Sequence, residues 1–284
     1  MPGTAQLTTA QLARYHADGY LVIPAFKDAA AIAALRARAL AIVDAFNPAE
    51  GSAIFTTQNQ AAASDDWFLG SDTTVRCFFE EAAFASDGSL KQAKALSINK
   101  IGHAMHDLDP VFEQFSRDPR LAAIARAIGL QDAKVWQSQY IFKQPGIGGE
   151  VRWHQDATFF DTTPVSVTTF WFALEAATID NGCLWVEPGG HAGPMRERFL
   201  REGEGVRMEQ LDAMPWPDNS VAVPLEAQAG DLVVFHGLLP HYSAPNTSPV
   251  SRHAYTLHAT DGTTSYSKDN WIQRGAALPV RGFD

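Results

Sequence analysis

The sequence predicts a mainly β protein with flanking helices, in which N-terminal helices pack on an antiparallel barrel of the jelly-roll type. Three observations predict this class. Apolar residues recur at helical spacing before about residue 130, short runs of β-forming residues follow from about residue 131, and Gly, Pro, Asn and Asp separate those runs. The 284 residues are 46% hydrophobic and 19% charged, which suits one domain over 1–284, with helices in about 1–130 and the barrel in about 131–284.

Helices are predicted in three N-terminal segments. The first begins at a capping threonine, Thr8 or Thr9, and ends at Gly19. The second follows Asp28 and carries an apolar stripe through A-I-A-A-L-R-A-R-A-L-A-I-V. The third runs from about 110 to 128. A short strand, Y-L-V-I-P, separates the first two helices.

The remaining elements are one loop and a series of strands. Residues from about 47 to 72 are rich in Ala, Ser, Asp, Gln and Asn, so a loop over a pocket is expected there. The predicted strands of the barrel are V-W-Q-S-Q-Y-I-F, V-T-T-F-W-F-A-L, C-L-W-V-E, L-V-V-F-H and H-A-Y-T-L-H.

Charge and composition narrow the class of partner. The net charge of −10 disfavours nucleic acid and anionic membranes, but it is compatible with a small acidic ligand in a local basic pocket. No apolar run is long enough to span a membrane, and the first residues lack the pattern of a signal peptide. Cys77 and Cys183 lie far apart, which disfavours a disulfide framework or a thiolate zinc site. A cytoplasmic protein is therefore expected, and its oligomeric state is left open.

The stretch W-H-Q-D-A-T-F-F places His154 and Asp156 one residue apart among aromatic residues. If 151–158 is a strand, both side chains point to one face and Gln155 points to the other. Two histidines and one carboxylate on one side of a metal form the facial triad of non-haem Fe(II) oxygenases. The alternative is a His and an Asp that bond to each other or to the backbone.

The third ligand is predicted in A-G-D-L-V-V-F-H-G-L-L-P-H-Y-S, where either His236 or His241 could serve. In the following strand, Arg252, Thr256 and His258 share a face. A buried arginine needs an anion, and its fork matches a carboxylate. A dicarboxylate that reaches from the metal to Arg252 fits this pattern; the alternative is a structural salt bridge.

His103 and His106 lie three residues apart in G-H-A-M-H-D-L-D. On a helix they would share one face. Three interpretations stay open: a polar helix face, a contact with substrate, and a second metal site.

Taken together, these motifs resemble the phytanoyl-CoA dioxygenase family. The resemblance rests on H-x-D, G-D-L-V-V-F-H-G-L-L-P-H-Y-S and S-R-H-A-Y, and it extends to S-I-N-K-I-G-H-A, Q-S-Q-Y-I-F-K-Q-P and N-G-C-L-W. It covers nearly the whole chain and is weakest from about 194 to 220. It implies a double-stranded β-helix of the cupin type and an enzyme that uses Fe(II), 2-oxoglutarate and O₂ to hydroxylate a small molecule, releasing succinate and CO₂.

The resemblance also assigns roles to individual residues. It makes His241 the distal metal ligand beside His154 and Asp156, and it leaves His236 structural. Because family members that halogenate lack the carboxylate, Asp156 favours hydroxylation. Arg252 anchors the distal carboxylate of 2-oxoglutarate. The other residues expected at the 2-oxoglutarate site are Lys100, Trp171, Ser243 and Gln139, the last of which stands where a family relative has Met.

Two other classes of function remain as alternatives: a cupin-like metal hydrolase, and a non-catalytic barrel that binds a metal or ligand. A hydrolase has no need of Arg252 and Lys100 facing a dicarboxylate, and no general-base glutamate is evident beside the triad. The primary substrate is not readable from the sequence. Specificity is expected in the stretches 47–72 and 194–220.

Overall fold

The computed structural model describes residues 6–49, 51, 53–57, 61, 65–218 and 220–284. An eight-stranded sheet, ordered β1-β13-β8-β15-β5-β4-β3-β2, forms its largest element, and all neighbours in it are antiparallel except β2 and β3. Its strands are β1 (Tyr20–Ile23), β2 (Ile54–Phe55), β3 (Val75–Glu80), β4 (Ile98–His103), β5 (Ala133–Ile141), β8 (Thr168–Ala173), β13 (Leu232–His236) and β15 (Ala254–Asp261).

A second sheet, ordered β12-β9-β14-β6, packs against the first. Its strands are β6 (Val151–His154), β9 (Leu184–Val186), β12 (Val223–Leu225) and β14 (His241–Ser243). Side chains of β8 and β13, among them Trp171 and Phe235, meet Leu184 and Val186 of β9 in one buried cluster. Two antiparallel sheets packed face to face confirm the predicted mainly β, jelly-roll class.

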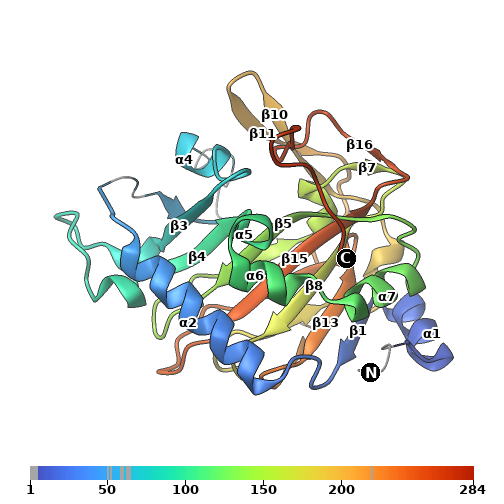
Figure 1. Ribbon diagram of the computed structural model, residues 1–284, viewed down its shortest axis with the longest axis horizontal. Coiled ribbons are helices and arrows are strands. Elements are labelled where there is room, and N and C mark those ends of the chain that lie inside the picture. Colours follow the sequence, from blue (N-terminus) through green and yellow to red (C-terminus); the bar gives the residue numbers. More distant parts are fainter. Residues whose placement is uncertain (1–5, 50, 52, 58–60, 62–64, 219) are drawn as a thin grey trace.

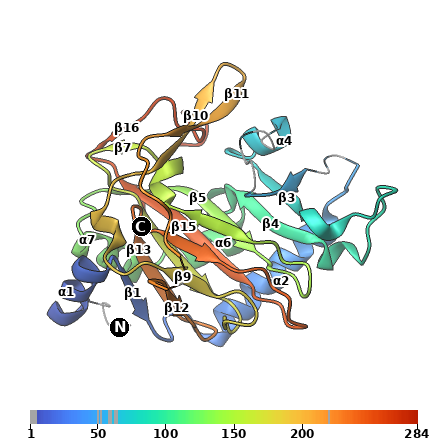
Figure 2. The ribbon, with the colours of Figure 1, turned by 180° about the vertical axis from the view of Figure 1, so that it is seen from behind.

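Helices cover the outer face of the large sheet, where α2 (Ala29–Ala45) and α6 (Pro110–Ser116) lie across the strands (Figure 1). From behind, β9 and β12 lie on the opposite face (Figure 2). The remaining elements are α1 (Thr9–Asp18), α4 (Asp66–Leu69), η1 (Glu81–Ala83), η2 (Lys94–Leu96), α5 (Met105–Leu108), α7 (Pro119–Ala127), η3 (Asp156–Phe159), β7 (Thr162–Thr163), η4 (Gly190–Ala192), β10 (Glu197–Glu202), β11 (Gly205–Gln210) and β16 (Ser265–Tyr266).

The predicted starts of the first two helices are confirmed. Thr8 caps α1, and it forms a reciprocal capping box with Gln11, while Gly19 ends the helix in the left-handed conformation. Asp28 caps α2. No helix among the described residues is long and apolar enough to cross a membrane.

Two predictions about the N-terminal part need correction. Four of the eight strands in the large sheet precede residue 131; β1 is the predicted strand Y-L-V-I-P, but β2, β3 and β4 were not predicted. Strands β3 and β4 are buried along most of their length on both faces, so they lack the alternation that identifies a strand. The helix predicted from about 110 to 128 is two helices, because Pro119 cannot continue α6 and Asp118 caps a new one.

The loop predicted at 47–72 is only partly a loop. It contains β2, which joins the edge of the large sheet, and α4 with Asp65 as its cap. Part of the predicted loop lies outside the described residues, namely 50, 52, 58–60 and 62–64.

Candidate metal centre

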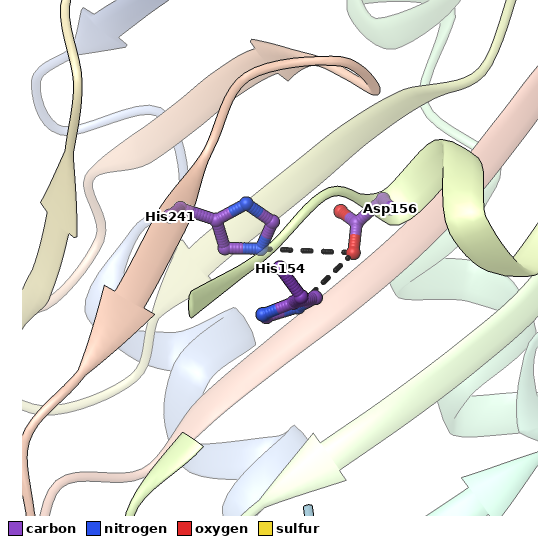
Figure 3. Close-up of side chains that lie close together, drawn as sticks. All are labelled: His154, Asp156 and His241. Atoms are coloured by element: carbon purple, nitrogen blue, oxygen red, sulfur yellow. Dashed lines mark ion pairs between the residues drawn. The ribbon is translucent and has the colours of Figure 1, made fainter. Parts of the chain in front are cut away.

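His154 and His241 face each other across the pairing of β6 with β14. They are direct partners in the antiparallel register, and their ring centroids lie 4.0 Å apart. Each imidazole approaches the same oxygen of Asp156: Oδ1 lies 3.5 Å from Nε2 of His154 and 3.6 Å from Nε2 of His241 (Figure 3). The structure therefore brings together the three residues that the sequence analysis selected, 87 positions apart at the extremes.

Asp156 does not lie in the strand that the sequence analysis predicted for it. The strand ends at His154, and Asp156 begins the 3₁₀ turn η3. Gln155 between them is extended and points away, as predicted. Its side-chain amide donates to the carbonyls of Pro194 and Leu238, so it ties the metal strand to the loop that precedes His241.

The hydrogen bonds of the two imidazoles orient them for a metal. Nδ1 of His154 lies 2.8 Å from the carbonyl of Arg152, and Nδ1 of His241 lies 2.9 Å from the carbonyl of Leu239. Because a carbonyl only accepts, each Nδ1 carries the proton and each Nε2 presents a lone pair. Burial and the neighbouring His154 lower the pKa of His241 to about 4, which keeps its ring neutral.

One ligand atom from each of His154, Asp156 and His241 lies within 4.8 Å of the others, and no other group of three such residues in the described part of the chain does so. Burial opposes ionisation of Asp156, but His241 and His258 hold the pKa of this carboxyl well below its usual range. Two neutral nitrogens and one anionic oxygen on one side of a common point are suited to a divalent metal with open positions.

The second oxygen of Asp156 is held by two residues that the sequence analysis did not assign to the site. The hydroxyl of Thr169 donates to Oδ2, and Nε2 of His258 lies 3.5 Å from the same atom. The ring of Phe160 stacks on His258 at 5.1 Å. A metal ligand with a fixed outer partner is a recurrent feature of metal sites. His258 was identifiable from its shared face with Arg252; Thr169 had no local signal.

Arg252 lies in the same cavity without an anionic partner. It is 2% exposed, its Nε donates to the carbonyl of Gly182 at 3.1 Å, and its Nη2 lies 3.4 Å from Oγ of Ser243. Nη1 has no hydrogen-bond partner among the described residues. Burial lowers the pKa of Arg252 to about 10, so the group stays charged at neutral pH. The structural salt bridge that was the alternative is absent from the described residues.

A second buried basic residue, Lys143, was missed by the sequence analysis. Its Nζ donates to the carbonyl of Gly149 at 2.6 Å and lies 3.4 Å from the carbonyl of Ser243. Burial and the nearby Arg252 hold the pKa of Lys143 well below its usual range. The signal was its place on the inward face of the segment Q-S-Q-Y-I-F-K, two positions beyond Ile141.

The other predicted residues of the cavity are present in its wall. Trp171 lies with its ring 5.6 Å from the guanidinium of Arg252. Lys100 donates to Oε1 of Gln139 at 2.9 Å and sits over the ring of Phe55. Gln139, whose role the sequence left uncertain, thus accepts a hydrogen bond from Nζ of Lys100.

The remaining histidines separate clearly. His236 lies outside the cavity, and its Nδ1 accepts from the backbone of Leu238, which fits the structural role predicted for it. His103 ends β4 and lines the cavity, whereas His106 lies in α5 and bonds to Ser138. The expectation that His103 and His106 share a helix face is wrong, because the helix begins only after His103.

Not all aromatic residues of the motif W-H-Q-D-A-T-F-F line the cavity. Phe159 and Phe160 line the cavity, while the ring of Trp153 stacks on Tyr242 with the ring centroids 5.5 Å apart.

A jelly-roll barrel with a His–Asp–His corner and an unpaired arginine in one cavity defines the class: a cupin-type mononuclear metal protein with an anion subsite. Solved structures share this fold. The non-heme alpha ketoglutarate dependent carbocyclase SnoK from nogalamycin biosynthesis aligns at a TM-score of 0.65 and 20% identity over 99% of both chains. The epimerase SnoN, in complex with Fe3+ and alpha ketoglutarate, aligns at 0.63 and 17% over 95% of this chain and 97% of its own.

Sequence comparison then identifies the family. The model of the phytanoyl-CoA dioxygenase (PhyH) family matches residues 15–254. Phytanoyl-CoA dioxygenase 1 from Oryza sativa subsp. japonica is 46% identical over 275 residues, which cover 96% of each chain. The chain belongs to the phytanoyl-CoA dioxygenase family, as the resemblance in its motifs indicated.

Proposed function

We propose that this protein is an Fe(II)- and 2-oxoglutarate-dependent dioxygenase that hydroxylates a small-molecule substrate. One observation carries the proposal: a three-residue metal corner and a buried arginine without a carboxylate partner line the same cavity. A hydrolytic metal site does not need the second feature. Membership of the family and the neighbours' bound groups support the same cofactors.

The residues fit Fe(II). His154 and His241 offer neutral Nε2 atoms, Asp156 offers one anionic oxygen, and this donor set suits non-haem Fe(II). When bound, Fe(II) with 2-oxoglutarate supplies the activation of O₂, coupled to release of succinate and CO₂. The protein's part is to hold the three ligands on one side of the metal so that the other side stays open.

The residues also fit a dicarboxylate. Arg252 would pair with the far carboxylate of 2-oxoglutarate through Nη1. Ser243 would support this contact, because its hydroxyl accepts from Nη2 of Arg252 and donates to the carbonyl of Gly182. An anion there removes the cost of burying the guanidinium unpaired. Trp171 would close the side of this subsite, and Lys100 would place its amino group in the same cavity.

Aromatic side chains limit the access of water to the reacting centre. Phe159 and Phe160 line the cavity beside Asp156, and Phe160 is 1% exposed. Exclusion of water prevents side reactions of a reactive intermediate. The aromatic setting of the first motif is thereby explained.

We further propose that residues 1–284 form one domain, because strands from both halves of the chain share the large sheet.

The test begins with purified protein, Fe(II) and 2-oxoglutarate without oxygen. The expected result is a weak visible charge-transfer band, followed by succinate once air is admitted. Asp156→Ala is expected to lose both signals. If folded, iron-loaded wild-type protein gives neither signal, the proposal is wrong, and a metal hydrolase or a non-catalytic barrel takes its place.

A further inference from the structure

Three side chains in the cavity, Lys100, Gln139 and Gln137, are joined by hydrogen bonds whose donors and acceptors can be assigned. Nζ of Lys100 donates to Oε1 of Gln139 at 2.9 Å, so the oxygen of this amide faces Lys100 and its nitrogen faces away. The amide nitrogen of Gln139 then donates to Oε1 of Gln137 at 2.7 Å. The amide nitrogen of Gln137 therefore keeps both hydrogens, and no described residue accepts them. Gln137 is 3% exposed and lines the cavity.

A second chain fixes the tautomer of His103. The hydroxyl of Ser71 donates to the backbone carbonyl of Phe68, and Oγ of Ser71 lies 2.7 Å from Nδ1 of His103. Since the hydroxyl hydrogen is already committed, Nδ1 must carry the proton and donate to Ser71. Nε2 of His103 then presents a lone pair, and none of the described side chains or backbone groups donates to it.

Aromatic rings surround the imidazole of His103. Its ring lies 5.5 Å from Phe68, 5.6 Å from Phe78 and 5.2 Å from Trp271. Burial and the positive charge of Lys100 hold the pKa of His103 well below its usual range, so the ring stays neutral. It therefore acts as an acceptor and not as a cation.

The charges elsewhere in the cavity are committed to other tasks. Arg152 pairs with Glu197 at 2.9 Å, and Asp156 belongs to the metal centre. Arg252 and Lys143 lie together at the proposed end of the 2-oxoglutarate site, and Nζ of Lys100 donates to Gln139. What remains around His103 and Gln137 is one acceptor and one donor on neighbouring strands, β4 and β5, walled by aromatic rings.

We propose that His103 and Gln137 recognise an uncharged hydroxyl or carboxamide group of the primary substrate. Such a group donates to Nε2 of His103 and accepts from the amide of Gln137. An ionised carboxylate has no hydrogen to donate to Nε2 of His103, and an ammonium group has no lone pair with which to accept from the amide of Gln137. This inference rests on the proposed function, since it places the substrate in the cavity of the metal centre.

The test uses three matched probes of one shape: cyclohexanecarboxamide, its N,N-dimethyl derivative and cyclohexanecarboxylate. Dissociation constants are measured by ligand-observed NMR on the full chain with Zn(II) and 2-oxoglutarate, so that no turnover is needed. The carboxamide is expected to bind at least about tenfold more tightly than either relative. His103→Phe, which keeps a ring in the aromatic wall, is expected to remove this preference. His16→Phe, an exposed matched change, keeps it.

Ser71→Ala provides a second variant that retains the imidazole. It removes the acceptor that fixes the proton on Nδ1 of His103. The ¹⁵N spectrum of histidine-labelled protein is therefore expected to show both tautomers of His103. The preference for the carboxamide probe is expected to fall. Equal binding of all three probes, no binding of the carboxamide, or an unchanged preference in His103→Phe overturns the inference. The proposed function fails separately, through absence of the Fe(II)–2-oxoglutarate band in wild-type protein.

Discussion

Thr169→Val is expected to weaken metal binding without removing a metal ligand. The hydroxyl of Thr169 donates to Oδ2 of Asp156, while Oδ1 faces the two histidines. Valine has nearly the same shape, so packing in β8 is preserved. The carboxylate loses the donor that keeps Oδ2 away from the metal, and it becomes free to rotate.

The magnitude follows from the burial of the carboxylate. Asp156 is 5% exposed, so water does not replace the lost donor. A hydrogen bond to a charged group contributes about 1.5–3 kcal/mol, and His258 at 3.5 Å is too far to compensate fully. A tenfold change in affinity corresponds to about 1.4 kcal/mol. The dissociation constant for the metal is therefore expected to rise roughly 10- to 100-fold, which matches other outer-sphere changes.

The assay is anaerobic titration of the apoprotein with Fe(II), repeated with Co(II), whose visible spectrum also reports the coordination number of the metal. Thr169→Ser restores the hydroxyl and is expected to restore affinity. Thr158→Val is the matched control, because the hydroxyl of Thr158 is buried without a hydrogen-bond partner among the described residues. An affinity of folded Thr169→Val within about twofold of wild type would refute the reasoning.

Three further outcomes are expected. Arg252→Ala raises the apparent KM for 2-oxoglutarate at least about tenfold, measured by succinate formation, because the far carboxylate loses a charge-assisted partner; an unchanged KM contradicts the anchoring role. Burial pushes the pKa of Asp107 up, but His106 and Arg117 hold it well below its usual range. Its contribution to stability is therefore present above the unfolded pKa of about 3.9 and lost as the pH falls below it, so Asp107→Asn should flatten the acid limb of urea-unfolding midpoints against pH. Thr8→Ala removes the capping box of α1 and should lower the free energy of unfolding by about 1 kcal/mol; urea titration that shows no loss speaks against the cap.

Local signals in the sequence were reliable where one residue acts on its own neighbours. Thr8, Asp28 and Gly19 begin or end helices as predicted, because a cap depends only on atoms a few residues away. The same holds for the two inward positions at His154 and Asp156. The strand predicted at 151–158 ends at His154, and the 3₁₀ turn η3 follows from Asp156. The extended backbone of Gln155 nevertheless keeps the side chains of His154 and Asp156 on one side.

Signals failed where burial removes periodicity. Strands β3 and β4 are covered on both faces, so neither alternation nor a helical stripe marks them. Because β4 was not predicted, His103 was considered as a helix residue, although it is the last residue of β4. The partner residues Thr169 and Gln137 carry no local signature at all.

The sequence by itself indicated the family and the three candidate metal ligands, and it predicted Arg252 as the anchor of 2-oxoglutarate, because these depend on which residues occur in which order. Only the tertiary structure decided how they are used. The register of β6 with β14 sets His241 opposite His154. The neighbouring β4 and β5 let Lys100 orient two glutamines, and thereby the donor of Gln137. Hydrogen-bond direction within a buried network depends on contacts between distant segments, and spacing along the chain does not record those contacts.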